Sequence, residues 1–175
     1  MILSLFRKNA PREPVYALYS AIVAQSRHPR FYAEYGVPDT VTGRFDMICL
    51  HLALLFRRLR GEGDQAREFR QAVFDLFFKD MDRSLREMGI GDLAIPKRIQ
   101  KLVGVFYGLS DGLALALDSG DQAGLEALLR RNMLAEQPAA AAELLAAYAE
   151  QEAERLVRLS TATILSGSIG IEEPA

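Results

Sequence analysis

Residues 42–60 read TGRFDMICLHLALLFRRLR, and this stretch predicts the central helix of an all-α fold. Apolar side chains recur along it at steps of three and four residues, which is the spacing of one helix face. That face consists of Phe45, Ile48, Cys49, Leu52, Leu55, Phe56 and Leu59. Met47, Leu50 and Leu54 widen the apolar arc almost around the helix. A helix with so wide an arc is buried on several sides, so we expect other helices to surround it.

Helices with an apolar face precede and follow this stretch. The pattern predicts them over residues 13–27, 65–88, from Pro96 onward, 122–133 and 139–165, separated by turns rich in Gly and Pro. We expect Asp64 to cap the helix that follows it. The sequence shows no alternating strand pattern, hairpin signal or fixed-period repeat. It therefore predicts an all-α, single-domain bundle of six or seven helices.

Two short segments flank the helical domain, which we assign to residues 13–165. Segment 1–12 combines large apolar side chains with Arg7 and Lys8, a pattern typical of contact with a membrane surface. Packing of the same side chains on the bundle is the alternative interpretation. Segment 166–175 begins with SGSIG and is expected to fray as a flexible tail. The first residues lack the pattern of a cleaved signal peptide, so we expect the protein to remain in the cytoplasm.

The composition is that of a globular protein, because half of the 175 residues are hydrophobic and a quarter are charged. Cys49 is the only cysteine and lies in an apolar run, so we expect a small buried side chain and no internal disulfide. Residues 1–110 contain 17 Lys and Arg against 12 Asp and Glu, whereas residues 111–175 contain 4 against 11. The basic part can face a polyanion such as ribosomal RNA or an acidic lipid surface, or the two parts can complement each other.

No pattern of catalytic or metal-binding residues is found in the sequence. The two histidines, His28 and His51, have no carboxylate or second histidine at ligand spacing. Three Asp residues within 75–82 interleave with Lys and Arg on one predicted helix, which favours local ion pairs. A nucleophile elbow, a phosphate-binding loop and a dinucleotide fingerprint are all missing. The sequence therefore predicts a protein that is not an enzyme and uses no cofactor or metal.

Glycines recur every four residues within LVGVFYGLSDGLALAL, residues 102–117. Gly104, Gly108 and Gly112 lie on one side of a helix, where missing side chains let another helix approach closely. A membrane-spanning helix needs about 20 apolar residues, and this stretch is shorter and is interrupted by Asp111. We therefore expect a tightly packed helix of the bundle. A groove that receives a transmembrane helix of another protein is the alternative.

A family resemblance is strongest over residues 35–108. It is carried by YGVPDTVTGRFDMICLHLALLFRRLR (35–60), VFDLFFKDMDRSLREMGIGDLAIPKRIQ (73–100) and FYG (106–108). The most specific motifs are GRFD (43–46), DMD with LREMG (80–89) and GDL with PK (91–97). In these motifs the sequence resembles the ubiquinol-cytochrome c chaperone family of mitochondria and alpha-proteobacteria. Members of this family often carry a basic residue directly after the Tyr-Gly pair at 107–108. This sequence has Leu109 at that position.

The resemblance implies a helical, non-catalytic factor that protects or presents newly made cytochrome b during assembly of the cytochrome bc1 complex, complex III of the respiratory chain. From the mitochondrial relatives it also implies a small partner protein and a position near the ribosomal exit. We expect the protein to lie in the cytoplasm, peripheral on the cytoplasmic face of the inner membrane. The expected client-binding or partner-binding residues are Arg44, Asp46, Asp80, Asp82, Arg86, Lys97 and Tyr107.

Two hypotheses of other classes stay open at this point. A ribosome-associated or RNA-binding module would use the basic runs at residues 57–60 and 97–101, and its binding would depend steeply on salt. A small-molecule or lipid-binding helical enzyme would need a closed pocket with polar groups at its centre, which the sequence does not reveal.

Overall fold

The computed structural model describes residues 12–170 and 174, and within these residues all regular structure is helical. The prediction of an all-α single-domain bundle is confirmed. Six long helices are accompanied by two helices of five residues each, α2 and α8. In chain order they are α1 Arg12–Ser26, α2 Pro29–Ala33, α3 Val41–Arg58, α4 Asp64–Glu87, α5 Ile95–Ser119, α6 Gln122–Met133, α7 Ala139–Arg158 and α8 Thr161–Leu165. The apolar and basic segment predicted at the N-terminus lies outside the described residues apart from Arg12.

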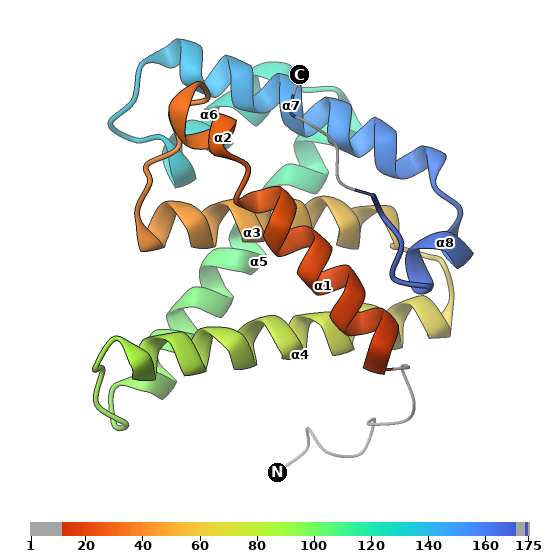
Figure 1. Cartoon of the computed structure of the whole chain (residues 1–175). Coiled ribbons are helices and arrows are strands. Elements are labelled where there is room, and N and C mark those ends of the chain that lie inside the picture. The colour runs from red at the N-terminus through yellow and green to blue at the C-terminus, as the bar shows by residue number, and fades with distance from the viewer. Residues whose placement is uncertain (1–11, 171–173, 175) are drawn as a thin grey trace.

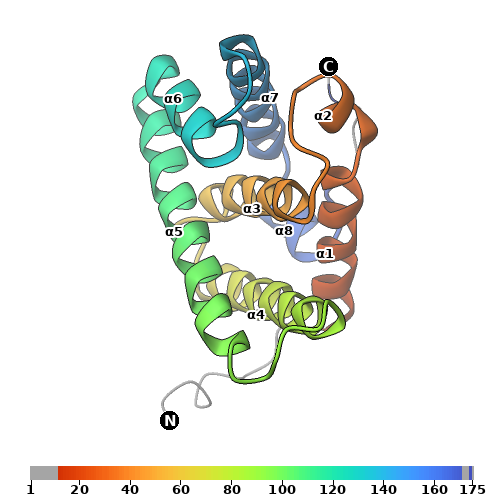
Figure 2. The ribbon, with the colours of Figure 1, turned by 90° about the vertical axis from the view of Figure 1, so that its left-hand side faces the viewer.

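Helix α3 runs through the middle of the bundle (Figures 1 and 2). Helices α1, α5 and α7 pack directly against it, and every residue from 45 to 55 is buried. On the side of α4, the Phe45 ring stacks on the Phe77 ring at 5.5 Å between centroids. The predicted central helix is therefore confirmed, and its wide apolar arc is explained by neighbours on all sides.

The turn before α3 explains one glycine of the GRFD motif. Thr40 caps the helix, because its Oγ1 accepts a hydrogen bond from the Gly43 amide at 3.1 Å. A Cβ atom on Gly43 would lie only 2.0 Å from the Pro38 carbonyl oxygen. Only a residue without a side chain allows the preceding turn to fold this closely over the first turn of α3.

The start of α4 differs from the sequence-based expectation. Asp64 does not cap this helix; it is the first helical residue and forms an ion pair with Arg67 at 3.0 Å. Gly63 occupies the capping position with φ +88°, a conformation that other residues rarely adopt. The capping prediction for Asp64 is wrong because the backbone turns into the helix one residue earlier than expected.

The helix predicted over 139–165 is interrupted. Helix α7 ends at Arg158, Leu159 is extended, and Ser160 caps the short helix α8 by accepting a hydrogen bond from the Thr163 amide at 3.0 Å. Arg58 of α3 donates to the carbonyl oxygens of Leu156 at 3.1 Å and Leu159 at 2.8 Å. The prediction of one continuous helix is wrong because a side chain from α3 satisfies the carbonyls at the end of α7.

The described part of the C-terminal segment lies against the bundle, although we expected it to fray. The Ile169 side chain is buried, and its carbonyl oxygen accepts a hydrogen bond from Arg155 of α7 at 2.5 Å. A Cβ atom on Gly167 would lie 2.7 Å from the Pro14 carbonyl oxygen, so this turn packs closely on α1. Residues 171–173 and 175 of the predicted tail lie outside the described residues.

A buried polar cluster joins α1, α3 and α7. His51 Nδ1 lies 2.7 Å from the Met47 carbonyl oxygen, and His51 Nε2 lies 2.7 Å from the Tyr148 hydroxyl. A proton on Nδ1 donated to Met47 leaves Nε2 to accept the Tyr148 proton, and burial lowers the pKa of His51. His51 is thus a satisfied core residue. No group of three potential metal-ligating side chains lies within residues 12–170 and 174.

Candidate functional site

The outward face of α5 is largely uncovered, and it combines glycine and apolar positions with the exposed charged residues Lys97, Lys101, Asp111 and Asp118. Within the part of the chain that the structure describes, no atom lies within 4 Å of a Cβ atom placed on Gly104 or Gly108. The Val105 side chain is 37% exposed and Leu115 is 74% exposed. Together Gly104, Val105, Gly108 and Leu115 form what we call the α5 strip.

Among the described helices, α5 alone is long and apolar enough to cross a membrane by length and composition. A core helix of this composition is usually mostly buried, yet only 28% of its most apolar window is buried. This makes the α5 strip the most conspicuous candidate for binding another apolar molecule.

The three glycines of α5 have different surroundings. A Cβ atom on Gly112 would lie 2.7 Å from Leu128 Cδ1, so this glycine lets α5 and α6 pack closely. The expectation of tight packing within the bundle is confirmed at Gly112 and is wrong for Gly104 and Gly108, which face open space. Their side-chain-free surface is available to a partner.

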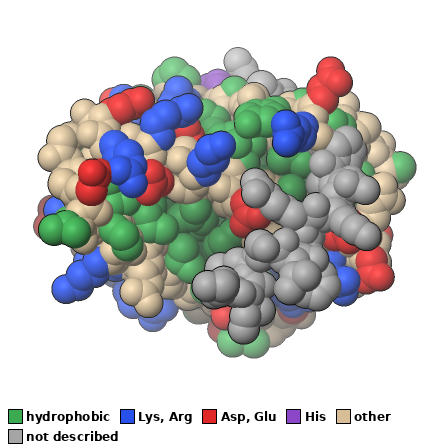
Figure 3. All heavy atoms as spheres, turned by 90° about the horizontal axis from the view of Figure 1, so that it is seen from below, with side chains coloured by type: hydrophobic (Ala, Val, Ile, Leu, Met, Phe, Trp, Pro, Cys, Tyr) green, Lys and Arg blue, Asp and Glu red, His purple; other side chains and the backbone are tan. Residues whose placement is uncertain are grey.

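Exposed apolar and basic side chains also gather where α4 joins α5. Met88 is 56% exposed and Leu93 is completely exposed, while Ile95 is buried and anchors the start of α5. Lys97 and Arg98 follow in the first turn of α5, and both are exposed. Figure 3, which views the molecule from the α4 side, shows hydrophobic side chains gathered beside Lys and Arg side chains, with Asp and Glu side chains among them. The junction of α4 and α5 therefore combines apolar contact area with charges of both signs.

Three charged residues form an exposed chain of ion pairs at the same end. Arg86 pairs with Asp82 one helical turn away at 2.7 Å and also with Asp92 of the connector. The Arg86 hydrogen bond lowers the pKa of Asp82. Asp82 and Arg86, two of the predicted contact residues, are thus brought together, and Lys97 lies exposed in the following helix.

Asp80, Arg44 and Asp46 are placed elsewhere. Asp80 accepts a hydrogen bond from the Tyr19 hydroxyl at 2.9 Å and so ties α4 to α1. Arg44 pairs with Asp39 at 2.8 Å at the start of α3, on the surface. Asp46 is only 7% exposed, and burial raises its pKa to about 7. Little of the Asp46 side chain is therefore open to a partner in this structure.

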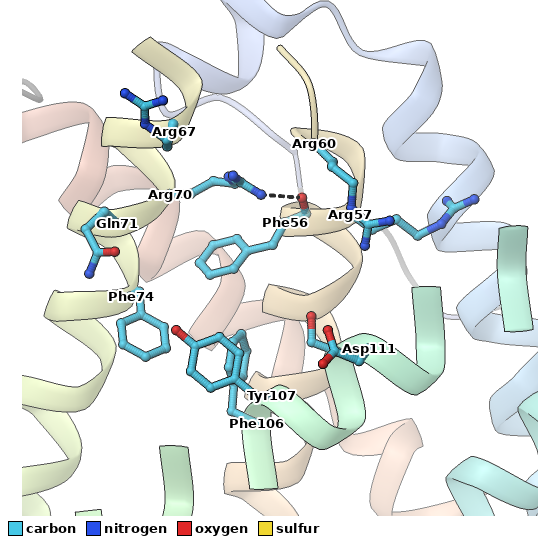
Figure 4. Close-up of a pocket in the computed structure, with 11 residues that line it drawn as sticks. Phe56, Arg57, Arg60, Arg67, Arg70, Gln71, Phe74, Phe106, Tyr107 and Asp111 are labelled. Carbon is cyan, nitrogen blue, oxygen red and sulfur yellow. Dashed lines mark hydrogen bonds between the residues drawn. The ribbon is translucent and has the colours of Figure 1, made fainter. Parts of the chain in front are cut away.

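Tyr107 lies in a pocket between α3, α4 and α5 (Figure 4). Its ring is 52% exposed and packs beside Phe74 and Phe106, each at 5.7 Å between centroids. Phe56 completes the aromatic wall of this cavity, whose volume is about 300 Å³. The remaining lining is polar or charged, with one carboxylate, that of Asp111, and four guanidinium groups, those of Arg57, Arg60, Arg67 and Arg70. We call this cavity the arginine pocket.

Sequence reasoning did not identify the arginine pocket. Arg67, Arg70 and Phe74 follow one another at helical spacing on α4, so their shared face could be read from the sequence. The sequence does not show which other helices of the bundle supply the rest of the pocket lining. Arg58, part of the basic run proposed for RNA, points instead to the end of α7 and to Glu62 at 3.0 Å.

Comparisons with known proteins agree on one relationship. Residues 33–171 match the family described as Ubiquinol-cytochrome C chaperone. The crystal structure of the Cbp3 homolog from Brucella abortus is similar to this chain with a TM-score of 0.85 and 40% identity, covering 99% of this chain and 97% of that one.

Two vertebrate relatives are more distant, and both are named ubiquinol-cytochrome c reductase complex assembly factor 1. The Xenopus laevis protein is 23% identical over 120 residues, which cover 69% of this chain and 60% of the relative. The Mus musculus protein is 25% identical over 142 residues, which cover 79% of this chain and 48% of the relative. The chain thus spans between about half and three fifths of the length of these two relatives.

Proposed function

Since the chain belongs to the ubiquinol-cytochrome C chaperone family, we propose that it is a non-enzymatic assembly chaperone that holds newly made cytochrome b for the cytochrome bc1 complex. The names of the two vertebrate relatives support a role in assembling that complex. The choice of cytochrome b as the client rests on the family resemblance of the motifs between residues 43 and 97. A small partner protein and a position near the ribosomal exit stay predictions.

The observation that carries the proposal is the uncovered α5 strip. Newly made cytochrome b presents transmembrane helices, which have apolar surfaces and lack their final partners before assembly. Small residues allow two helices to approach closely, and the surfaces of Gly104 and Gly108 are open to such an approach. Val105 and Leu115 add apolar contact area on either side. The strip therefore offers a temporary surface for one apolar helix of the client.

The exposed ion pairs beside the strip suit a role in orienting the client. Asp82, Arg86 and Asp92 lie at the junction of α4 and α5, and Lys97 lies in the first turn of α5. Charges at the rim of an interface contribute more to association rate and orientation than to affinity. We place the protein at the cytoplasmic face of the inner membrane, since its proposed client is inserted there.

The test uses two valines that differ in their position. Val105 lies in the α5 strip and Val157 lies exposed on α7, so Val105→Glu and Val157→Glu add the same charge at different surfaces. Deleting the gene should deplete spectroscopic cytochrome b and bc1 activity without changing transcript levels. Val157→Glu should restore both, whereas Val105→Glu should not, although both variants melt near the wild-type temperature. Normal cytochrome b in the deletion strain, or equal rescue by the two variants, would contradict the proposal.

A further inference from the structure

The arginine pocket carries more positive charge than its carboxylates balance. Arg57 and Arg60 share one carboxylate, that of Asp118, at 2.7 and 3.5 Å. Arg67 pairs with Asp64 on the exposed side of α4. Arg70 forms no ion pair within residues 12–170 and 174. Asp111 also lines the pocket, so four guanidinium groups face three carboxylates and the pocket keeps a surplus of one positive charge.

Arg70 is the residue whose bonding is least complete. Its Nη1 donates to the Phe56 carbonyl oxygen at 3.2 Å, as Figure 4 shows, while its Nε is buried without an acceptor. Burial, followed by the charges of Arg60 and Arg67, lowers the pKa of Arg70. A buried donor without an acceptor and a cation without a counter-ion are both unfavourable. An anion entering the pocket would supply the missing counter-ion.

The opposite wall of the pocket is aromatic, and its mouth borders the α5 strip. Tyr107 lies one helical turn from Gly104, and Asp111 lies one turn from Gly108, so pocket and strip are adjacent faces of one helix. A small inorganic anion would leave the aromatic wall and the neighbouring strip without a partner. A molecule with an anionic head and an apolar body would fill both.

We propose that the arginine pocket binds the phosphate headgroup of an anionic phospholipid, with the apolar part of the lipid lying along the aromatic wall toward the α5 strip. Guanidinium groups bind phosphate through paired N–H donors, which favours arginine over lysine at such sites. Basic residues near an anionic lipid surface also add attraction that salt weakens. The phosphate site does not depend on the proposed function, although the apolar part of the lipid would border the α5 strip on which we place the client.

The experiment uses the purified full chain with vesicles of phosphatidylcholine, with and without phosphatidylglycerol, and with soluble short-chain phosphatidylglycerol. Arg67→Gln combined with Arg70→Gln removes two pocket cations. Arg130→Gln combined with Arg131→Gln removes two exposed cations from α6 and is the matched control. The pocket pair should weaken binding to the short-chain lipid by roughly ten-fold or more, and the control pair should change it little.

A second variant keeps the test valid if the arginine variant unfolds. Asp111→Asn removes a carboxylate from the pocket lining on an exposed helix position, so it should tighten lipid binding a few-fold. Equal weakening by the pocket and control pairs would show general charge attraction and overturn the proposal. It would also be overturned if inorganic phosphate bound as tightly as the short-chain lipid. Binding of an acidic peptide without binding of the lipid would also overturn the proposal. Unchanged lipid binding by Asp111→Asn would overturn it as well.

Discussion

Gly43→Ala and Gly108→Ala are the same chemical change, and the structure predicts opposite effects on stability. On Gly43 the new methyl group would lie 2.0 Å from the Pro38 carbonyl oxygen and 3.0 Å from the Pro38 carbonyl carbon. Both are backbone atoms, so the turn or the start of α3 must move. Overpacking costs about 1–3 kcal/mol, and an approach of 2.0 Å to a backbone atom belongs in the upper part of that range, about 2–3 kcal/mol. The better helix propensity of alanine offsets at most about 1 kcal/mol of that cost.

We therefore expect Gly43→Ala to lower the free energy of unfolding by about 1–2 kcal/mol. For a domain of this size each kcal/mol shifts the melting temperature by about 2–4 °C, so the expected loss is about 2–8 °C. Gly108 lies inside α5, and no atom of the described residues lies within 4 Å of the new methyl group. Gly108→Ala should therefore gain about 1 kcal/mol from helix propensity and raise the melting temperature by about 2–4 °C.

Thermal and urea unfolding followed by far-ultraviolet circular dichroism would measure both variants beside the wild type. The packing argument fails if Gly43→Ala melts at or above the wild-type temperature. A lower melting temperature for Gly108→Ala would mean that something covers this glycine. Repeating the Gly108→Ala melt at several protein concentrations would show whether a second copy of the chain provides that cover.

Three further predictions follow from the same structure. Reversing the charges of Asp82 and Lys97 together should weaken recovery of cytochrome b in pull-downs. The melting temperature should change little, because both side chains lie at the surface. A large loss of stability would show instead that these residues hold the fold together. Burial raises the pKa of Asp46 to about 7, so the folded chain keeps a proton that the unfolded chain releases above about pH 4. The Asp46 contribution to the free energy of unfolding should fall as the pH rises from about 4 to about 7, and urea unfolding of Asp46→Asn should lack this fall. The same pH dependence in both proteins would contradict this. Elemental analysis of the purified chain should find no stoichiometric metal, and one tightly held zinc or iron per chain would refute that expectation.

Much of the fold could be predicted because its signals are local. The wide apolar arc of α3 and the starts of most helices depend on residues close together in the chain, and these predictions are confirmed. The break at the end of α7 was missed because Arg58, about a hundred residues earlier, satisfies its last carbonyls. Helical spacing gives no information about such distant partners.

The candidate site was harder to predict, because helical spacing places a residue on a face without saying what covers that face. Gly104, Gly108 and Gly112 have the same spacing, yet only Gly112 meets a neighbouring helix. Arg44 and Asp46 belong to the same GRFD motif, yet the Arg44 side chain lies on the surface and the Asp46 carboxyl is buried. The arginine pocket needs three helices to meet, so its outline exists only in the folded chain.

The central claim is that an apolar helix of cytochrome b lies on the α5 strip, and site-specific photo-crosslinking tests it most directly. A photoreactive residue is introduced at position 108 in one strain and at exposed position 147 of α7 in another. After irradiation of cells during cytochrome b synthesis, the tagged chain is purified and its adducts are identified. We predict a covalent adduct with cytochrome b from position 108 and little or none from position 147. No cytochrome b adduct from position 108, or equal adducts from both positions, would contradict the account.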